Sequence, residues 1–382
     1  MQYDVTRIFR ICESDETIYI PQDKCILTTQ SDDTTSIEGF SGYYLLNTSS
    51  EKNAIVLLSG REKFHVPSQL FLQPGDFIYL DEESKEVVLL ESSDVPDRVL
   101  FLTGQCNSNC IMCPYTHKWR TKAKASDFAL LKRFVDLMNP YAEYVCVTGG
   151  EPTLLGEGFL TLLSHIKQHF VNPLVHILTN GRVFYYPDFV EDYMNVCSPN
   201  TLLGIPIYGH NAQTHDYITQ TPGSFLQTQE GIQNLLHKKS RIEIRIVVSA
   251  LNATSLLHIG AYIIEKLSSV HIVSIMGIEM MGSAFIHKEI VWIDFDELKS
   301  ALYDLCLMLI ENGIQVQLYN FPLCKLHPSL WGIAKKSISS NKVEYFPICD
   351  TCTVKDSCGG FFNSTIHMPS VTAQPVIGGV EQ

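Results

Sequence analysis

The sequence predicts an α/β protein built around a partial (β/α)6 TIM-like barrel, with an N-terminal β-rich module and a C-terminal cysteine-rich module. Three observations lead to this fold class. Apolar strand-like runs alternate with helical stretches after about residue 98, short strands separated by turn residues precede them, and cysteines gather near the end of the chain. Hydrophobic residues make up 45% of the chain and charged residues only 18%, a balance typical of a globular protein with a sizeable core.

The central region carries the alternation that predicts the barrel. Strand-to-strand spacing of roughly 30–45 residues is typical of βα units with parallel strands. The expected strands are Val99–Thr103, Tyr144–Thr148, Val175–Thr179, Leu202–Tyr208, Ile242–Val248 and Val270–Ile275. The expected helices include Asp127–Met138, Gly158–His169, Ser224–His237 and Phe295–Asn312. In such a barrel the chemistry lies at the carboxyl ends of the strands.

Two smaller regions flank the barrel, so we predict three domains, residues 1–95, 96–313 and 314–382. Turn residues such as Pro74 and Gly75 divide the first region into short strands, which predict a small β-barrel or sandwich without a chemical motif. Its expected strands are Thr17–Ile20, Tyr43–Leu46, Ala54–Leu58, Leu70–Leu72, Phe77–Leu80 and Val87–Leu90. The last region has little periodicity and is rich in cysteine, which predicts a cluster-bearing module.

The first cysteine group follows the first barrel strand. Cys106, Cys110 and Cys113 have the spacing Cys-x3-Cys-x2-Cys, which places three thiols on one short loop. A 4Fe–4S cluster with three protein ligands keeps one iron open for a substrate or cofactor, much as a catalytic zinc keeps one position open. The spacing is not that of a zinc finger. Taken alone, however, it leaves a zinc knuckle or chance as competing interpretations.

With the string LTGQCNSNCIMCPY at this place, the chain resembles the radical SAM superfamily, whose signature is this CxxxCxxC motif on the loop after strand 1. The resemblance implies two cofactors, a 4Fe–4S cluster and S-adenosylmethionine (SAM), whose amino and carboxylate groups chelate the open iron. It also implies that an electron from the reduced cluster breaks the S–C5′ bond of SAM. That step releases methionine and a 5′-deoxyadenosyl radical.

Polar motifs end the next two strands. In VTGGEPTL, the resemblance assigns Gly149, Gly150 and Glu151 to the motif that holds the SAM amino group. The same string in isolation reads as an ordinary turn. In HILTNG, Thr179 and Asn180 stand where related enzymes place polar side chains against SAM, although a turn at the strand end explains Asn-Gly as well.

Two charged residues belong to later strands. Arg245 lies in the middle of IEIRIVVS, and a charge there is costly unless it is paired. The carboxylate of the cofactor is the expected partner, and an internal carboxylate is the alternative. The string IMGIEMMG resembles the family's adenine-binding segment, which implies a cofactor contact for Glu279. Met112 departs from the family, because many members have an aromatic residue before the third cysteine.

The second cysteine group contains Cys324 and then Cys349, Cys352 and Cys358 in the spacing Cys-x2-Cys-x5-Cys. Four thiols can hold structural zinc or a fully ligated Fe–S cluster, and the spacing alone favours zinc. Beside a radical SAM core, the spacing resembles part of the SPASM and twitch extensions of peptide-modifying enzymes. That resemblance implies one auxiliary 4Fe–4S cluster in a reduced version of the extension.

The tail carries a narrower resemblance. The strings YNFPLCKL and KVEYFPICDTCTVKDSCGGFF are similar to the C-terminal part of the His-Xaa-Ser system radical SAM maturases, specifically the C-type member. This implies an enzyme whose radical takes a hydrogen from a ribosomally made precursor peptide. The implied partners are that peptide, a second radical SAM maturase and an external reductant such as flavodoxin or ferredoxin. Two alternatives remain, a radical SAM enzyme acting on RNA or a nucleotide and a non-catalytic Fe–S or zinc assembly protein.

Composition narrows the classes further. The formal net charge of −13 argues against nucleic acid as a partner, because tracking a phosphate backbone requires a basic surface. The basic segment HKWRTKAK, residues 117–124, is the local exception, either a solvated helix start or a contact to an acidic substrate segment or the cofactor. The start MQYDVTRIFR lacks the apolar core of a secretory signal, and no apolar run is long enough to span a membrane. We therefore expect a cytoplasmic protein in which the 12 cysteines bind metal clusters or lie in the core.

Overall fold

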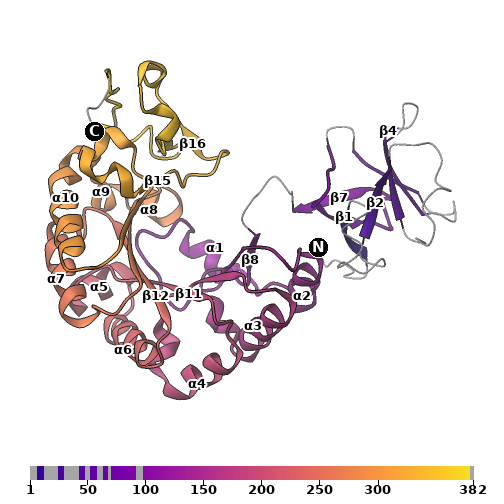
Figure 1. The fold of residues 1–382 in the computed structure, drawn as a ribbon, viewed down its shortest axis with the longest axis horizontal. Helices are drawn as coiled ribbons and strands as arrows, with labels where there is room; N and C mark the ends of the chain where they lie inside the picture. Colours follow the sequence, from indigo (N-terminus) through magenta and orange to yellow (C-terminus); the bar gives the residue numbers. More distant parts are fainter. Residues whose placement is uncertain are drawn as a thin grey trace.

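The computed structural model describes residues 7–12, 25–29, 43–47, 52–57, 63–67, 70–91 and 98–378. Within these ranges the chain forms an N-terminal β module, a central open barrel of strands and helices, and a C-terminal module that covers one end of the barrel (Figure 1). None of the helices in the described ranges combines the length and the apolar character needed to cross a membrane.

The central sheet has eight strands that lie side by side in chain order, and all of its neighbours pair in parallel. This confirms the predicted α/β fold class. The strands read as buried apolar runs, as expected for a parallel sheet covered on its outer face; in β13 all six residues are buried. The strands are β8 (Arg98–Phe101), β9 (Tyr144–Thr148), β10 (Leu174–Leu178), β11 (Thr201–Pro206), β12 (Arg241–Val248), β13 (Ile272–Gly277), β14 (Val316–Tyr319) and β15 (Ala334–Lys335).

Long helices cover the convex outer face of this sheet (Figure 1). They are α2 (Phe128–Leu137), α3 (Glu157–His169), α4 (Pro187–Val196), α6 (Ser224–His237), α7 (Leu256–Lys266) and α10 (Phe295–Glu311). In α10 the side chain of Asp294 caps the first turn, and Leu298, Leu302, Leu305 and Leu309 recur on one buried face. The expected helix Ser224–His237 and strand Tyr144–Thr148 have the bounds that the sequence predicted.

The central sheet continues past the domain boundary predicted at residue 313. Strand β14 starts three residues later, and β15 adds two more residues to the same sheet. Neither was expected from the sequence, because β14 is short and only alternately buried and β15 is too short to produce a pattern. The C-terminal module is therefore joined to the barrel through the sheet itself.

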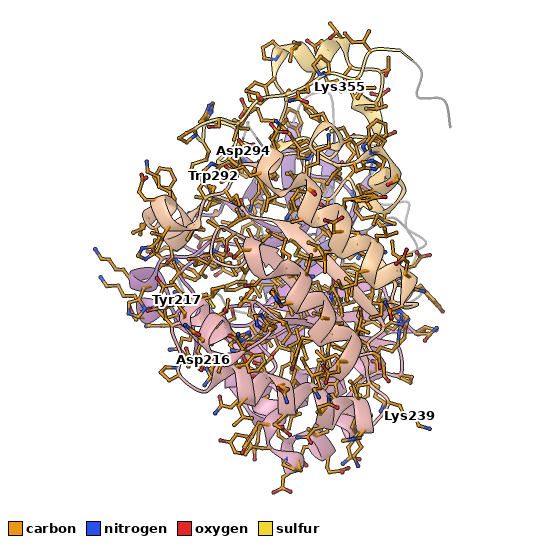
Figure 2. The ribbon with its side chains drawn as sticks, turned by 90° about the vertical axis from the view of Figure 1, so that its left-hand side faces the viewer. Asp216, Tyr217, Lys239, Trp292, Asp294 and Lys355 are labelled. Carbon is orange, nitrogen blue, oxygen red and sulfur yellow. The ribbon has the colours of Figure 1, made fainter. Side chains whose placement is uncertain are left out.

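Short helices lie over the carboxyl ends of the strands. They are α1 (His117–Lys122), α5 (Ala212–Thr219), α8 (Gly282–Ile286) and α9 (Lys288–Val291). Figure 2 shows α1 and α8–α9 on one side of the molecule, with Tyr217 of α5 beside them and Lys239 on the opposite side. These short helices enclose the loop that carries the first cysteine group.

The N-terminal module contains a sheet whose described strands follow the order β5-β4-β3-β2-β1-β6-β7. A bridge between His65 and Glu86 brings its two edges together, in keeping with the predicted small barrel or sandwich. The strands are β1 (Ile8–Cys12), β2 (Cys25–Thr29), β3 (Tyr43–Asn47), β4 (Lys52–Leu57), β5 (Lys63–His65), β6 (Phe77–Leu80) and β7 (Val87–Glu91). Arg133 of α2 donates two hydrogen bonds to the carbonyl of Ile8, so this module is fastened to the barrel.

One strand expected in this module is wrong. Leu70–Leu72 is irregular, and its leucines pack against the small core of the module from a loop. An apolar anchor in a loop has the same composition as a short strand, which explains the error. The expected strand Thr17–Ile20 lies outside the described residues.

The C-terminal module consists of short turns around a two-stranded hairpin, β16 (Val343–Glu344) and β17 (Phe361–Phe362). Its anchor is Lys325, which is fully buried and forms an ion pair with Asp296 of α10. A buried ammonium is tolerated only with such a partner, so this pair fixes the module against the barrel.

Candidate active site

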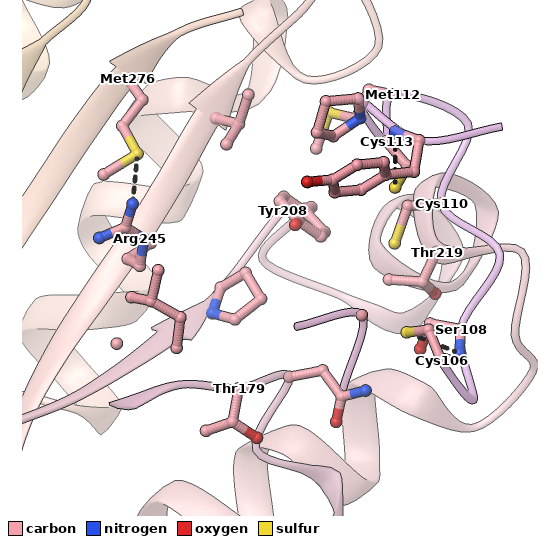
Figure 3. A pocket seen from close by; sticks show the side chains of 18 of the residues that line it. Cys106, Ser108, Cys110, Met112, Cys113, Thr179, Tyr208, Thr219, Arg245 and Met276 are labelled. Carbon is pink, nitrogen blue, oxygen red and sulfur yellow. Dashed lines mark hydrogen bonds between the residues drawn. The ribbon is translucent and has the colours of Figure 1, made fainter. Parts of the chain in front are cut away.

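A cavity of about 380 Å³ lies at the carboxyl ends of the central strands, and the thiols of Cys106, Cys110 and Cys113 line one side of it. In Figure 3 the three cysteines lie on one side, and Arg245 and Met276 lie on the other. The cysteines belong to the loop between β8 and α1. The structure thus brings together the three residues predicted to bind a cluster, at the end of the sheet where they were expected.

Two arginines hold this loop in place. The buried Arg120 of α1 donates from Nη1 to the carbonyl of Ser108 and from Nη2 to Oδ1 of Asn109, both at 2.7 Å. From the other side, Arg182 donates to the carbonyl of Asn107 at 2.7 Å. The basic segment HKWRTKAK is therefore a short helix whose arginine faces inward to brace the cysteine loop, while its lysines are exposed.

The environment of the thiols fits an iron–sulfur cluster. Burial raises the pKa of Cys110 to about 12 and also raises the pKa of Cys106, and a bound cation would counteract this shift and favour the thiolate form. Backbone N–H groups of Ser108 and Tyr115 point at the sulfurs of Cys106 and Cys113, each at 3.4 Å. Such N–H···S contacts tune the reduction potential of clusters. Three ligands on one loop beside a cavity leave room for a fourth ligand that the loop does not supply.

The Gly-Gly-Glu motif seats the cysteine loop on β9. A Cβ atom on Gly149 would lie 2.5 Å from the carbonyl oxygen of Thr103, and one on Gly150 would lie 2.3 Å from that of Gln105. Both positions therefore exclude any side chain, which lets the backbone N–H of Gly150 donate to Thr103 at 2.7 Å. Both glycines also line the cavity.

Glu151 is fully buried beneath these glycines and is absent from the cavity lining. Its Oε1 accepts hydrogen bonds from the hydroxyls of Thr153 and Thr179 at 2.6 and 2.7 Å, and its Oε2 accepts from the backbone N–H of Asn180 at 2.6 Å. Burial raises the pKa of Glu151, and these hydrogen bonds oppose that shift. The carboxylate therefore ties the end of β9 to the end of β10, and its contact with the SAM amino group stays a prediction.

Thr179 and Asn180 directly follow β10 and line the cavity. The Nδ2 of Asn180 donates to Oδ1 of Asn107 at 2.6 Å, which connects this strand end to the cysteine loop. The motifs after β8, β9 and β10 thus form one connected wall. The sequence predicted these motifs on one rim of the barrel, but it could not predict the hydrogen bonds between them.

Arg245 of β12 lines the opposite wall. Its Nη1 donates to both carboxylate oxygens of Glu243, at 3.2 and 3.0 Å, and its Nη2 donates to Sδ of Met276 at 3.2 Å. Burial alone would raise the pKa of Glu243, but the hydrogen bond with His176 and the charge of Arg245 outweigh it and lower the pKa to about 2. Arg245 therefore has an internal carboxylate partner, the alternative left open by the sequence, and its side chain remains 24% exposed.

The C-terminal module completes the cavity. Glu279, which follows β13, lines the cavity and forms a 3.0 Å ion pair with Lys342 of that module. Phe362 of β17 lines the same cavity, four residues after Cys358. The residue predicted to contact the adenine is thus held by a side chain from outside the barrel.

Two further residues line the cavity without any sequence signal. Tyr208 and His215 flank the turn between β11 and α5, and the backbone N–H of Tyr208 donates to Nδ1 of His215 at 3.2 Å. Burial lowers the pKa of His215 to about 4, so the ring is neutral near pH 7. Neither residue belongs to a recognisable motif. The one sequence feature that relates them is their separation of seven positions across the segment between β11 and α5.

The second cysteine group also converges. Cys324, Cys349, Cys352 and Cys358 line one small cavity of about 20 Å³ in the C-terminal module. Backbone N–H groups of Leu323 and Val376 point at the sulfurs of Cys358 and Cys352, at 3.3 and 3.4 Å. Burial raises the pKa of Cys324 and of Cys349, and a bound cation would favour their thiolate forms. Four convergent thiols with N–H donors fit a fully ligated cluster.

The thiols of each group line one cavity, but they are not arranged as the ligands of a single ion. In the described ranges, no set of three or more His, Cys, Asp or Glu side chains is arranged to hold a single metal ion. Of the five remaining cysteines, Cys12 and Cys25 lie together in the N-terminal module with their sulfurs 2.7 Å apart. The other three, Cys146, Cys197 and Cys306, are dispersed through the barrel.

Comparisons with known proteins agree on the central region. The model of the family described as the Radical SAM superfamily matches residues 100–250. A curated relative, the AdoMet-dependent heme synthase of Methanosarcina barkeri (strain Fusaro / DSM 804), is 27% identical over 154 residues. That match covers 40% of this chain and 42% of the relative, so the chain spans less than half the length of the relative.

Solved structures similar to this chain cover a larger share of it, 58% in both of the following cases. Native anSMEcpe with bound AdoMet is 18% identical, with a TM-score of 0.47 over 58% of this chain and 63% of that one. SuiB of Streptococcus suis bound to precursor peptide SuiA is 13% identical, with a TM-score of 0.47 over 58% of this chain and 48% of that one.

Proposed function

We propose that this chain, whose residues 100–250 form a radical SAM domain, is an enzyme that reductively cleaves SAM to start radical chemistry on a peptide. One observation carries the first half of the proposal. Three thiols from a single loop face a cavity of about 380 Å³, and no fourth cysteine is among the described residues that line it. A cluster held there keeps one iron for a ligand that enters the cavity.

When bound, the cluster supplies the electron that breaks the S–C5′ bond of SAM. Cys106, Cys110 and Cys113 hold it, and Gly149 and Gly150 let the backbone approach the cavity closely. Thr179 and Asn180 provide hydrogen bonds from the wall next to the cluster. Arg245, fixed by Glu243, presents its remaining guanidinium donors to a carboxylate in the cavity, and Glu279 contributes an acceptor at the end of β13. The buried Glu151 orients these strand ends.

We also propose that Cys324, Cys349, Cys352 and Cys358 hold an auxiliary 4Fe–4S cluster. The support is their convergence on one cavity and the N–H donors directed at Cys352 and Cys358. Iron content decides between this cluster and structural zinc. Two clusters correspond to about eight irons per chain, whereas one cluster with zinc corresponds to about four irons and one zinc.

The proposed substrate is a ribosomally made precursor peptide. The support is the resemblance of the second cysteine group and of the CGGFF tail to peptide-modifying maturases, together with the position of Phe362 on the cavity wall. A second maturase acting with this chain belongs to the same proposal. The match to a heme synthase makes a tetrapyrrole the second candidate substrate.

The test is anaerobic reconstitution with iron and sulfide, followed by reductant and SAM. The expected product is 5′-deoxyadenosine, measured by liquid chromatography, with about eight irons per chain. A reduced cluster that releases no 5′-deoxyadenosine would mean a non-catalytic Fe–S protein. Candidate peptides encoded beside the gene, with His-Xaa-Ser repeats, are then compared with a tetrapyrrole and an RNA oligonucleotide. Stimulation of 5′-deoxyadenosine formation by RNA alone, with a steep salt dependence, would overturn the peptide assignment.

A further inference from the structure

A basic and aromatic surface covers the outside of the first cysteine loop. It is built by the end of that loop, by α1 and by α8–α9, which lie on the same side of the molecule (Figure 2). Its apolar members are between 40% and 63% exposed, and they gather on one side of the molecule rather than being scattered singly. We call it the cluster-loop face, and it consists of Tyr115, Lys118, Trp119, Lys122, Lys124, Phe285, Ile286 and Lys288.

This face is in direct contact with the cysteine loop. The backbone N–H of Ser283 in α8 donates to the carbonyl of Cys113 at 2.9 Å, and its hydroxyl donates to the carbonyl of Tyr115 at 3.1 Å. The backbone N–H of Tyr115 lies 3.4 Å from the sulfur of Cys113. The rings of Tyr115 and Trp119 stack at 4.6 Å between centroids. An exposed aromatic pair therefore begins next to one of the predicted cluster ligands.

The charge of the face is opposite to that of the whole chain. Lys118, Lys122, Lys124 and Lys288 are exposed, and the ion pairs of the described residues include none of them. The chain as a whole has a formal net charge of −13, so it repels an acidic protein at long range. These four lysines outnumber the one exposed carboxylate of the same helices, Glu289, and the ammonium of Lys288 also lies over the ring of Phe285. The face therefore offers an acidic partner a favourable place to dock.

We propose that the cluster-loop face docks a small acidic one-electron carrier protein, which reduces the cluster held by Cys106, Cys110 and Cys113. This inference rests on the proposed function, because reductive cleavage consumes one electron per SAM. The carrier is oxidised by one electron and the cluster is reduced by one electron, and no atom is transferred. The contact at Cys113 gives the carrier a short path to the cluster, and the exposed aromatic and aliphatic side chains supply the apolar centre of the interface.

The position of the face favours a carrier over the peptide substrate. Of its eight members, Tyr115 alone is among the residues that line the cavity. A substrate seated in the cavity therefore leaves the lysines and most of the apolar surface uncovered. A partner that approaches the loop from outside covers them.

The experiment compares two reductants on the reconstituted enzyme. The double variant Lys118→Glu/Lys122→Glu is matched with Lys238→Glu/Lys239→Glu, which has the same net charge and changes the opposite side of the molecule (Figure 2). Cluster reduction is followed by loss of visible absorbance, with flavodoxin hydroquinone or with dithionite. Binding of oxidised flavodoxin is measured by calorimetry. For the first variant we expect reduction by flavodoxin to slow about tenfold at low salt, with weaker binding, whereas dithionite reduces both variants at the rate of the unmodified protein.

Equal rates with flavodoxin for both double variants would overturn the inference. Slower peptide turnover with dithionite in the Lys118→Glu/Lys122→Glu variant would also overturn it, because the face would then bind substrate. The variant Lys118→Gln/Lys122→Gln removes the charges without reversing them and gives an intermediate rate if the attraction is electrostatic. Normal cluster reduction without 5′-deoxyadenosine would instead contradict the proposed function and leave the docking surface intact.

Discussion

The two cysteine groups of this protein bear the same side chains but differ in access. Three thiols of the first group face a cavity of about 380 Å³ whose other walls carry polar and charged side chains. Four thiols of the second group face a cavity of about 20 Å³. A metal site with an incomplete ligand set and an adjoining cavity is suited to turnover, whereas a complete and closed set is suited to structure or electron storage. The difference in cavity size and in number of thiols indicates that a substrate would react at the first group.

The groups are also held in different ways. Charged side chains from two other elements, Arg120 and Arg182, brace the first loop. The sulfurs of the second group receive backbone donors such as the N–H of Val376, and a charged side chain, Lys336, reaches the carbonyl of Asp356 only at 3.2 Å. Charge-assisted hydrogen bonds are stronger than neutral ones, so the first loop is the better preorganised of the two. The predictions below test this division of roles.

We call Cys106, Cys110 and Cys113 the open group, and Cys324, Cys349, Cys352 and Cys358 the closed group. The largest effect on activity is expected when a cysteine of the open group is lost. Cys110→Ala removes one of three thiols, and no other cysteine among the described lining residues can replace it. We expect 5′-deoxyadenosine formation to fall to background and the iron content to fall by about four per chain. The matched control is Cys197→Ala, which changes the cysteine that follows α4 as its C-terminal cap and belongs to neither group. Activity retained by Cys110→Ala would show that the open group is not the site of SAM cleavage.

Loss of a cysteine from the closed group should abolish modification of the peptide and leave cleavage of SAM in place. Cys352→Ala leaves three thiols in the small cavity, so we expect about four irons to be lost. Formation of 5′-deoxyadenosine in the absence of peptide should stay within about threefold of the unmodified protein, while the peptide product disappears. Mass spectrometry of the peptide and metal analysis measure the two effects. If zinc rather than iron leaves the variant, the closed group holds zinc.

The sequence predicts the residues of the open group more completely than the side-chain contacts around them. A fixed spacing such as Cys-x3-Cys-x2-Cys identifies a loop, and the order of strands then places Gly149, Thr179 and Arg245 near it. Contacts that join distant segments leave no such spacing. The pairing of Glu279 with Lys342 depends on how the C-terminal module folds back, and the inward turn of Arg120 depends on the packing of α1. Neither contact could be predicted from the sequence, because tertiary contacts decide whether a single charged side chain is buried or paired.

The hydrogen bonds from Arg120 to the loop of the open group should contribute measurably to the free energy of unfolding. Arg120→Ala removes two charge-assisted hydrogen bonds from a buried side chain. We expect the free energy of unfolding to fall by about 2–3 kcal/mol, with faster loss of iron to a chelator. Arg120→Lys keeps the charge but cannot reach both acceptors in the same way, so an intermediate value is expected. Urea unfolding with both variants makes the measurement, and an unchanged midpoint would contradict the brace.

The last prediction concerns how the stability of the region around the open group depends on pH. His215 is buried beside the open group, whereas the lining of the closed group contains no histidine among the described residues. Burial holds the pKa of His215 at about 4, below its ordinary value of 6.5. The unfolded chain therefore takes up the proton first as the pH falls. Stability from this group is fully present above about pH 6.5 and declines as the pH falls toward 4, by about 1 kcal/mol per pH unit.

The matched variant for this prediction is His215→Gln, whose side-chain oxygen can still accept the hydrogen bond from the backbone of Tyr208. Since glutamine does not titrate, the difference in unfolding free energy between the two proteins should shrink as the pH falls from about 7 to about 5. Urea titrations at several pH values measure that difference. A constant difference across this range would mean that the imidazole of His215 has the same pKa in the folded and the unfolded protein, and it would contradict the role of burial.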